Sequence, residues 1–455
     1  MKKLSRRELL ASVAGATAAG IASIGLPGTK SGASQNGKPP SKFAEPVAPP
    51  AAKRLSAEDD ALLDEIERAA TLFFWEQADP ATGLVKDRSL AEGHDSRDVA
   101  SIASTGFGLT ALCIAAHRGY LDAAKARERV RATLRFLAGK MTEHHGFYFH
   151  FVNMRTGERV WNCELSTIDT SLLFCGVLTA RAFFDDDEIR SLATKIYERA
   201  DWPWFLDSGK MLSMGWKPED GFLDSTWDSY SELMMIYLLG LGSPTHPLPP
   251  ESWDAWKRPE FNYFGFKYIG SNAPIFVHQY SHAWFDFRLK RDRYADYFAN
   301  SILATRAHKQ FCLSLAPRFS DYSDQLWGIS ASDSEGGYVA WGGPPAMGPI
   351  DGSVVPCATA GSLPFLPDDT LRVLQNLRHK FEKRAWKRYG FVDSFNPLSH
   401  WTDPDVIGID QGISMLMAEN LRSGFVWETF MKSDAARQGM ERAGFKAAAP
   451  TGDAK

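Results

Sequence analysis

Apolar residues recur at steps of three and four along most of the chain after residue 55, a spacing that places them on one face of an α-helix. This period dominates the sequence and predicts an all-α protein of some twelve helices. The predicted helices span residues 57–77, 100–118, 122–140, 166–184, 186–201, 225–241, 278–291, 293–308, 353–363, 368–384, 409–422 and 424–433.

The connections between these helices alternate between long and short. Long polar and aromatic segments occupy residues 144–164, 202–222, 242–274, 314–352 and 390–408, whereas short turns lie at Gly119-Tyr120 and Asp185-Asp186. Loops longer than about 15 residues are uncommon in a compact domain unless they build a site. The alternation predicts a closed ring of helical hairpins, an (α/α)6 barrel (toroid), with long loops on the active-site face. A helical solenoid is the alternative, but the chain has no repeated motif of the kind that solenoids carry.

The N-terminus has the layout of a secretory signal. Consecutive arginines, Arg6 and Arg7, precede an Ala- and Gly-rich apolar run that ends near Pro27, which predicts a Tat signal peptide over residues 1–30. The run is short and weakly apolar for a membrane span of roughly 20 residues. We therefore expect cleavage, a periplasmic protein and the Tat export machinery as a partner, with no stable membrane insertion; an uncleaved anchor is the alternative.

Composition divides the rest of the chain. Residues 31–54 are Gly, Ser, Pro, Lys and Ala with little to bury, which predicts a disordered linker. No further linker interrupts the remainder, so we expect one catalytic domain over residues 55–440 and a disordered tail over residues 441–455. A formal net charge of −4 with interspersed signs gives no electrostatic case for nucleic acid. The five cysteines are widely spaced and are expected to be buried thiols.

The predicted loops are rich in tryptophan, carboxylates and amides. Flat indole rings stack on the C–H faces of sugars while carboxylates and amides bind hydroxyls, so this composition is typical of a saccharide cleft. Many of these rings are also expected to be core material, as buried aromatics usually are. The loop tryptophans are Trp75, Trp161, Trp202, Trp204, Trp216, Trp227, Trp284, Trp327, Trp341 and Trp401.

Glycosidic bond cleavage needs a protonated acid and a second carboxylate that activates water or attacks. Asp224, Asp228 and Glu232 are four residues apart, which would place all three on one face of the helix predicted over 225–241. Glu232 precedes a continuous apolar run, so burial and neighbouring anions are expected to raise its pKa. We assign Glu232 as the general acid; the structural alternative is that Asp224 caps the helix and Glu232 pairs with an arginine.

A second carboxylate pair, Glu164 and Asp169, stands at the start of another apolar helix. Ser166 and Asp169 have the spacing of a capping box, which explains Asp169 structurally. Glu164 precedes this cap and has no such explanation, so it is the better candidate for a catalytic or sugar-binding role. His278 and His282 are four apart and could ligate a metal, but no third ligand is evident, and we expect neither a metal nor a cofactor.

Several segments resemble a known family, the bacterial glycoamylase-like domain family, which is related to endo-β-1,2-glucanases of glycoside hydrolase family 144 and to the cyclisation domain of cyclic β-1,2-glucan synthases. They extend over nearly all of the chain after residue 70. The matching segments are 73–76 (FFWE), 83–88 (GLVKDR), 101–108 (SIASTGFG), 146–151 (GFYFHF), 164–170 (ELSTIDT), 232–247, 393–396 (DSFN), 410–412 (DQG) and 419–424 (ENLRSG).

This resemblance implies an (α/α)6 barrel and cleavage or transfer of β-1,2-linked glucose chains. Glu232 occupies the position that looks like the family's general acid, while the Glu164 to Asp169 stretch is similar to the cyclase-domain version. We therefore expect an exported glycoside hydrolase in which Glu232 donates a proton and Glu164 or Asp169 holds water or the sugar; a transglycosylase and a non-catalytic carbohydrate-binding protein are the alternatives. The expected substrate-binding residues are Asp87, Arg88, His150, Asp228, His278, His282, Trp284, Asp333, Asp393 and Trp401.

Overall fold

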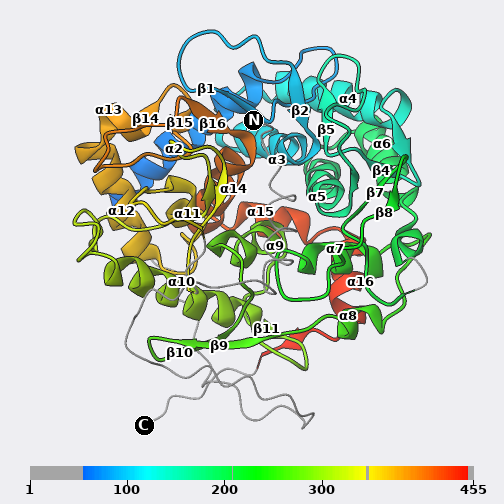
Figure 1. Ribbon diagram of the computed structural model, residues 1–455. Coiled ribbons are helices and arrows are strands. Elements are labelled where there is room, and N and C mark those ends of the chain that lie inside the picture. Colours follow the sequence, from blue (N-terminus) through cyan, green and yellow to red (C-terminus); the bar gives the residue numbers. More distant parts are fainter. Residues whose placement is uncertain (1–54, 207–208, 345–347, 449–455) are drawn as a thin grey trace.

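Helices form most of the regular structure of the protein (Figure 1). The structure is a computed structural model, and it describes residues 55–206, 209–344 and 348–448. The expected signal peptide, the linker and the last residues of the expected tail lie outside these ranges. No helix of the described residues is long and apolar enough to cross a membrane.

The helices follow the apolar period of the sequence closely. Each end of α3, for example, has its own capping group, because the Ser101 hydroxyl accepts the backbone N–H of Ser104 and Gly119 adopts a left-handed conformation. The helices of five or more residues are α2 (Ala57–Glu76), α3 (Ile102–Arg118), α4 (Ala123–Gly139), α5 (Thr167–Phe183), α6 (Asp187–Glu198), α7 (Met234–Leu241), α9 (Tyr280–Trp284), α10 (Tyr297–Ser314), α11 (Pro356–Ala360), α12 (Pro367–Lys380), α14 (Gly408–Arg422), α15 (Phe425–Phe430) and α16 (Asp434–Arg442).

The strands are short and pair locally, so they connect helices and build no extended sheet among the described residues. The antiparallel pairs are β1 (Arg88–Leu90) with β16 (Asp405–Ile407), β2 (Val99–Ser101) with β5 (Phe151–Asn153), β3 (Glu143–His144) with β4 (Phe147–Tyr148), β9 (Glu260–Tyr263) with β10 (Phe266–Ile269), β11 (Lys290–Arg291) with β17 (Lys446–Ala447), β12 (Ala331–Ser332) with β13 (Val339–Ala340), and β14 (Trp386–Lys387) with β15 (Gly390–Phe391), while β7 (Gly215–Lys217) lies between β6 (Leu165–Ser166) and β8 (Gly221–Phe222).

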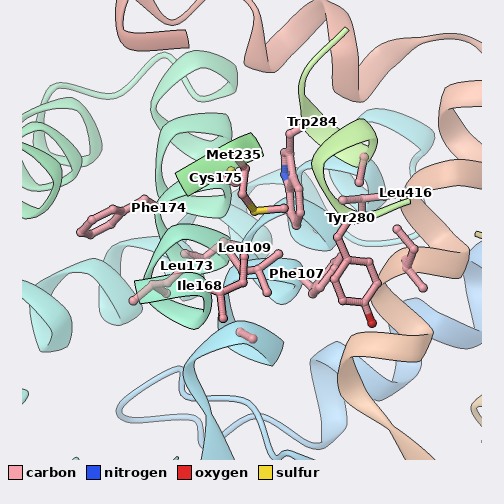
Figure 2. Packing of buried hydrophobic residues seen from close by; sticks show 14 of the residues in the cluster. Phe107, Leu109, Ile168, Leu173, Phe174, Cys175, Met235, Tyr280, Trp284 and Leu416 are labelled. Atoms are coloured by element: carbon pink, nitrogen blue, oxygen red, sulfur yellow. The ribbon is translucent and has the colours of Figure 1, made fainter. Parts of the chain in front are cut away.

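Helices α3, α5, α7, α9 and α14 meet in a buried apolar core (Figure 2). Their contact is close because glycines face each other: a Cβ added to Gly176 of α5 would lie 2.1 Å from the carbonyl oxygen of Gly106 in α3. All residues of α7 are buried, which explains why its sequence is apolar on every side.

Three predictions about element boundaries are wrong. The helix predicted over 278–291 ends at Trp284, the last residue of α9, and is followed by a loop and β11. The helix predicted over 225–241 begins only at Met234. The residues before Met234 form backbone hydrogen bonds with a distant segment instead of a helix: the N–H of Met214 donates to the carbonyl of Ser225, and the N–H of Trp227 donates to the carbonyl of Leu212. The expected tail does not start at residue 441, because α16 continues to Arg442 and β17 pairs with β11. The domain therefore extends past residue 440.

Candidate active site

Backbone pairing brings the segments that precede α3, α5 and α14 to one end of these helices. The N–H of Ile102 donates to the carbonyl of His150 at 3.2 Å, and the N–H of His150 donates to the carbonyl of Glu164 at 3.0 Å. The N–H of Gly408, the first residue of α14, donates to the carbonyl of Asp87 at 2.7 Å. We call this band the polar rim: residues 86–101, 148–153, 164–169 and 403–410. It collects histidine, arginine and carboxylates that are far apart in the sequence.

The first group on the polar rim is an imidazole between two carboxylates. His150 Nδ1 lies 3.3 Å from Glu164 Oε1, and His150 Nε2 lies 3.5 Å from Asp169 Oδ1. All three residues are buried. Asp169 also belongs to the capping box predicted from the sequence, since the hydroxyl of Ser166 accepts its backbone N–H at 3.0 Å. A histidine held in this way can carry a proton between the carboxylates or fix their orientation.

The second group surrounds a single guanidinium. Arg88 donates from Nε to Asp87 Oδ2 at 3.0 Å and from Nη1 to Asp333 Oδ2 at 2.5 Å. Asp393 accepts the backbone N–H of Asp333 at 2.6 Å, and Asp403 lies beside them. Burial disfavours a charged guanidinium, but the neighbouring carboxylates outweigh it and hold the pKa of Arg88 well above its usual range. This group can bind hydroxyls of a polar ligand through both donors and acceptors.

Burial also raises the pKa values of two carboxyl groups in this second group. It raises the pKa of Asp403 to about 7, with a further contribution from the charge of Asp333. The pKa of Asp393 is raised well above its usual range, first by burial and then by the charges of Asp410 and Asp403. Carboxyl groups so perturbed are common at functional sites because they can exchange protons near neutral pH.

Glu232 lies two residues before α7 and is buried. Its backbone carbonyl accepts the hydroxyl of Ser281 at 2.8 Å, which ties the start of α7 to α9. Asp224 and Asp228 do not share a helix face with Glu232, because the segment is extended; Asp224 is exposed, and Asp228 pairs with Lys257 at 3.0 Å in a solvated position. The prediction that the three carboxylates lie on one helix face is therefore wrong. Glu232 is nevertheless buried, as expected.

Three predicted substrate-binding residues belong to the core. Trp284 is fully buried, donates its indole N–H to Thr110 at 3.0 Å and packs against Phe107 (Figure 2). His278 and His282 are also buried, and burial lowers the pKa of each to about 3, so both are neutral. His278 ends the 3-10 helix η3 (Ile275–His278), and His282 and Trp284 lie in α9, so all three side chains lie among buried neighbours. That they line a subsite stays a prediction.

The structure adds Asp403, which the sequence did not single out, and it shows that the loop tryptophan Trp161 is exposed. Asp403 joins the group around Arg88, two residues after the partly exposed Trp401. Trp161 is 68% exposed and has a positive φ of 57°, and its ring meets Phe151 edge-on at 5.1 Å. Phe151 in turn stacks on His150, with ring centroids 3.8 Å apart. A flat, exposed ring this close to the first group is a surface on which a sugar could stack.

The structure thus assembles the predicted residues into two groups. Glu164, Asp169 and His150 form one; Asp87, Arg88, Asp333 and Asp393 form the other. In each group three potential ligand atoms lie within 4.8 Å of one another. A signal for Asp403 existed in the sequence, since Asp403 and Asp405 flank Pro404, three residues after Trp401.

Comparisons with known proteins agree with this geometry. The Glycoamylase family model, described as "Putative glucoamylase", matches residues 224–434, a range that begins just before Glu232. An exo-β-1,2-glucooligosaccharide sophorohydrolase (non-reducing end) of Parabacteroides distasonis is 26% identical over 423 residues, 84% of this chain. The chain spans 58% of the length of that curated relative.

Two solved structures match nearly the whole described fold. The endo-β-1,2-glucanase of Chitinophaga pinensis, solved as a complex with sophorotriose and glucose, is 26% identical with a TM-score of 0.80, covering 86% of this chain and 99% of its own. A "putative glucoamylase" of Bacteroides uniformis is 29% identical with a TM-score of 0.80, covering 87% and 99%. The resemblance to the glycoamylase-like family and to β-1,2-glucanases that the sequence motifs indicated is confirmed.

Proposed function

We propose that this chain is a glycoside hydrolase that cleaves a bacterial glucan with β-1,2 linkages. The observation that carries the proposal is the match to the β-1,2-glucanase of Chitinophaga pinensis over 86% of the chain, together with buried carboxylates at one end of the inner helices. Such carboxylates are what glycosidic cleavage requires. The substrate is an oligo- or polysaccharide.

We further propose that the fold is an (α/α)6 barrel. Helices α3, α5, α7, α9, α11 and α14 would form the inner ring, since most of their residues are buried. Partly solvated helices such as α4, α6 and α12 pack outside them. In this arrangement the polar rim lies at the mouth where the starts of the inner helices converge, which places the candidate carboxylates around one substrate.

In the proposed mechanism Glu232 is the general acid and protonates the leaving glycosidic oxygen. Its buried position keeps bulk water away from the proton that it would donate. Glu164 or Asp169, held by His150, positions the attacking water or the sugar. Arg88 and Asp87 bind hydroxyls beside them. Binding through fixed hydrogen bonds orients the bond to be cleaved, which supplies a large part of the rate enhancement in such enzymes.

The N-terminal arginines support a further proposal about location. Arg6 and Arg7 followed by an apolar run are typical of export by the Tat route, which would deliver the folded domain to the periplasm. A fusion of residues 1–54 to a reporter that is active only after export tests this. Reporter activity that survives Arg6→Lys with Arg7→Lys would rule out the Tat route.

The activity is tested with linear and cyclic β-1,2-glucan as substrates. We expect wild-type protein to release short oligosaccharides and new reducing ends, and Glu232→Gln to abolish both because the amide cannot donate a proton. Glu428→Gln is the matched control, since Glu428 is exposed on α15. Rearranged chains without new reducing ends would instead establish a transglycosylase. Equal glucan binding by wild type and Glu232→Gln, with no products from either, would establish a carbohydrate-binding protein.

A further inference from the structure

The carboxylates of Asp333, Asp393 and Asp403 converge in the interior, with ligand atoms within 4.8 Å of one another. Asp393 and Asp403 are 1% and 3% exposed. Three segments bring them together: Asp333 follows β12, Asp393 follows β15, and Asp403 precedes β16. The arrangement does not depend on a single helix or turn.

Each carboxylate is fixed through one of its oxygens. The N–H of Asp333 donates to Asp393 Oδ2 at 2.6 Å, the N–H of Asp405 donates to Asp403 Oδ1 at 3.0 Å, and Arg88 donates to Asp333 Oδ2. The backbones are also tied to one another, since Asp403 N–H donates to the carbonyl of Ser394 and the Ser394 hydroxyl donates to that of Asp333. The carboxylates are therefore held rigidly before any ligand arrives.

The opposite oxygens of two of these carboxylates have no N–H donor. Among the residues that the structure describes, no N–H reaches Asp393 Oδ1 or Asp403 Oδ2, although both atoms are buried, and the carboxyl groups of Asp403 and Asp410 are the charged neighbours of Asp393. Asp292 shows the usual alternative within the same protein: both of its oxygens accept hydrogen bonds, from Trp253, Tyr297 and the backbone N–H groups of residues 294 and 295. Buried carboxylate oxygens without a donor are costly and call for a neutralising ligand.

The negative charge of this group must also be balanced. Arg88 is the cation in contact with this group, and it is shared between Asp87 and Asp333. It can neutralise one of the five carboxylates Asp87, Asp333, Asp393, Asp403 and Asp410, so the ionised group would carry an excess of negative charge in the interior. Protons or a metal cation must supply the balance.

We propose that Asp333, Asp393 and Asp403 bind a divalent cation, with Ca²⁺ the ion that fits best. Carboxylate oxygens are the ligands that Ca²⁺ prefers, and with bond lengths of roughly 2.3–2.6 Å its opposite ligands lie about 5 Å apart, which accommodates the observed spacing. Mg²⁺ demands shorter bonds and a stricter octahedron. The ion would displace the protons that burial otherwise keeps on Asp393 and Asp403, and it would stabilise the junction of β12, β15 and β16.

Asp333 and Asp393 also belong to the group around Arg88 that is proposed to bind glucan hydroxyls, so the test uses the cation alone, without glucan. The full chain is treated with EDTA, dialysed and titrated with CaCl₂ at pH 7.5 by isothermal titration calorimetry, with MgCl₂ as the comparison. We expect one Ca²⁺ per chain, weaker Mg²⁺ binding, and a Tm that rises by several degrees with Ca²⁺ concentration because the ion binds only the folded state. Asp403→Asn should weaken Ca²⁺ binding at least tenfold.

Asp292→Asn is the matched control, since it also removes a buried carboxylate but one whose oxygens are satisfied; it should lower Tm while leaving the Ca²⁺ titration unchanged. The wild-type titration decides the question even if Asp403→Asn fails to fold. The absence of both heat and a Tm shift at millimolar Ca²⁺ would overturn the proposal. A higher Tm for Asp403→Asn in EDTA, with no response to Ca²⁺ in wild type, would show instead that Asp393 and Asp403 share a proton.

Discussion

His150 Nδ1 lies 3.3 Å from Glu164 Oε1, within a buried group that also includes Asp169. The two residues are 14 apart in the sequence, and the N–H of His150 donates to the carbonyl of Glu164 as well. Backbone and side chain therefore fix the same pair, so the imidazole has little freedom to leave the carboxylate. This relationship makes His150 a positioning residue for the second carboxylate of the proposed reaction.

Replacing His150 with Gln should lower kcat by roughly tenfold or more while changing KM little, because even a small displacement of a reacting group is costly. The amide keeps a hydrogen bond to Glu164 but cannot take up a proton. The pH profile of kcat should therefore shift as well. A purely structural role would lower Tm and the amount of active enzyme but leave the pH profile unchanged, and steady-state kinetics between pH 5 and 8 distinguish these outcomes.

Replacing Trp161 with Ala should raise KM for long glucan chains with little change in kcat. Stacking of a sugar on an exposed ring contributes binding energy, and the 68% exposure of Trp161 means that little packing is lost. Trp161→Phe, which keeps a flat ring, should restore most of the affinity. Equal KM values for wild type and Trp161→Ala on every chain length would show that the ring takes no part in binding.

Replacing Gly176 with Ala should destabilise the protein strongly, by about 3 kcal/mol or more, because overpacking between helices forces the backbones apart. The added Cβ would lie 2.1 Å from the carbonyl oxygen of Gly106. Gly139→Ala is the control, since a Cβ there meets nothing within 4 Å. Urea denaturation of the three proteins measures the difference, and similar midpoints for Gly176→Ala and wild type would contradict the close contact of α3 with α5.

The buried His282 predicts a loss of stability in acid. Its pKa of about 3 in the folded state lies below the ordinary value of 6.5 that applies to the unfolded chain. The unfolded state therefore takes up a proton first, so this contribution is complete above pH 6.5 and is lost as the pH falls toward 3. The slope is about 1.4 kcal/mol per pH unit for one histidine.

The measurement for His282 is urea denaturation of wild type and His282→Gln at pH 8, 6, 5 and 4. The free energy of unfolding of wild type should fall more steeply below pH 6.5, by that slope, than the free energy of His282→Gln. Parallel curves for the two proteins would mean that His282 is protonated equally in both states. A difference at pH 8 measures the packing of the imidazole separately, because the histidine is neutral there in both states.

The sequence by itself determined most of the helices. The apolar period located α3, α5 and α14 to within about two residues, because amphipathic and buried helices must repeat their apolar positions with the helical turn. The capping box at Ser166 was also visible, since its two residues are local. Local patterns did not reveal that residues 224–233 are not helical, because their backbone partners near residues 212–214 and 257 are distant in the sequence.

Only the tertiary structure decided which polar residues meet. Glu164, His150 and Asp169 could be named as candidates from their loops, but backbone pairing between segments brought them together. Trp284 and His282 are residue types that are common in sugar-binding sites, but both are buried where α9 packs into the core. Asp333, Asp393 and Asp403 lie up to 70 residues apart. Their convergence depends on the junction of β12, β15 and β16, and long-range pairing of this kind leaves no periodic trace in the sequence.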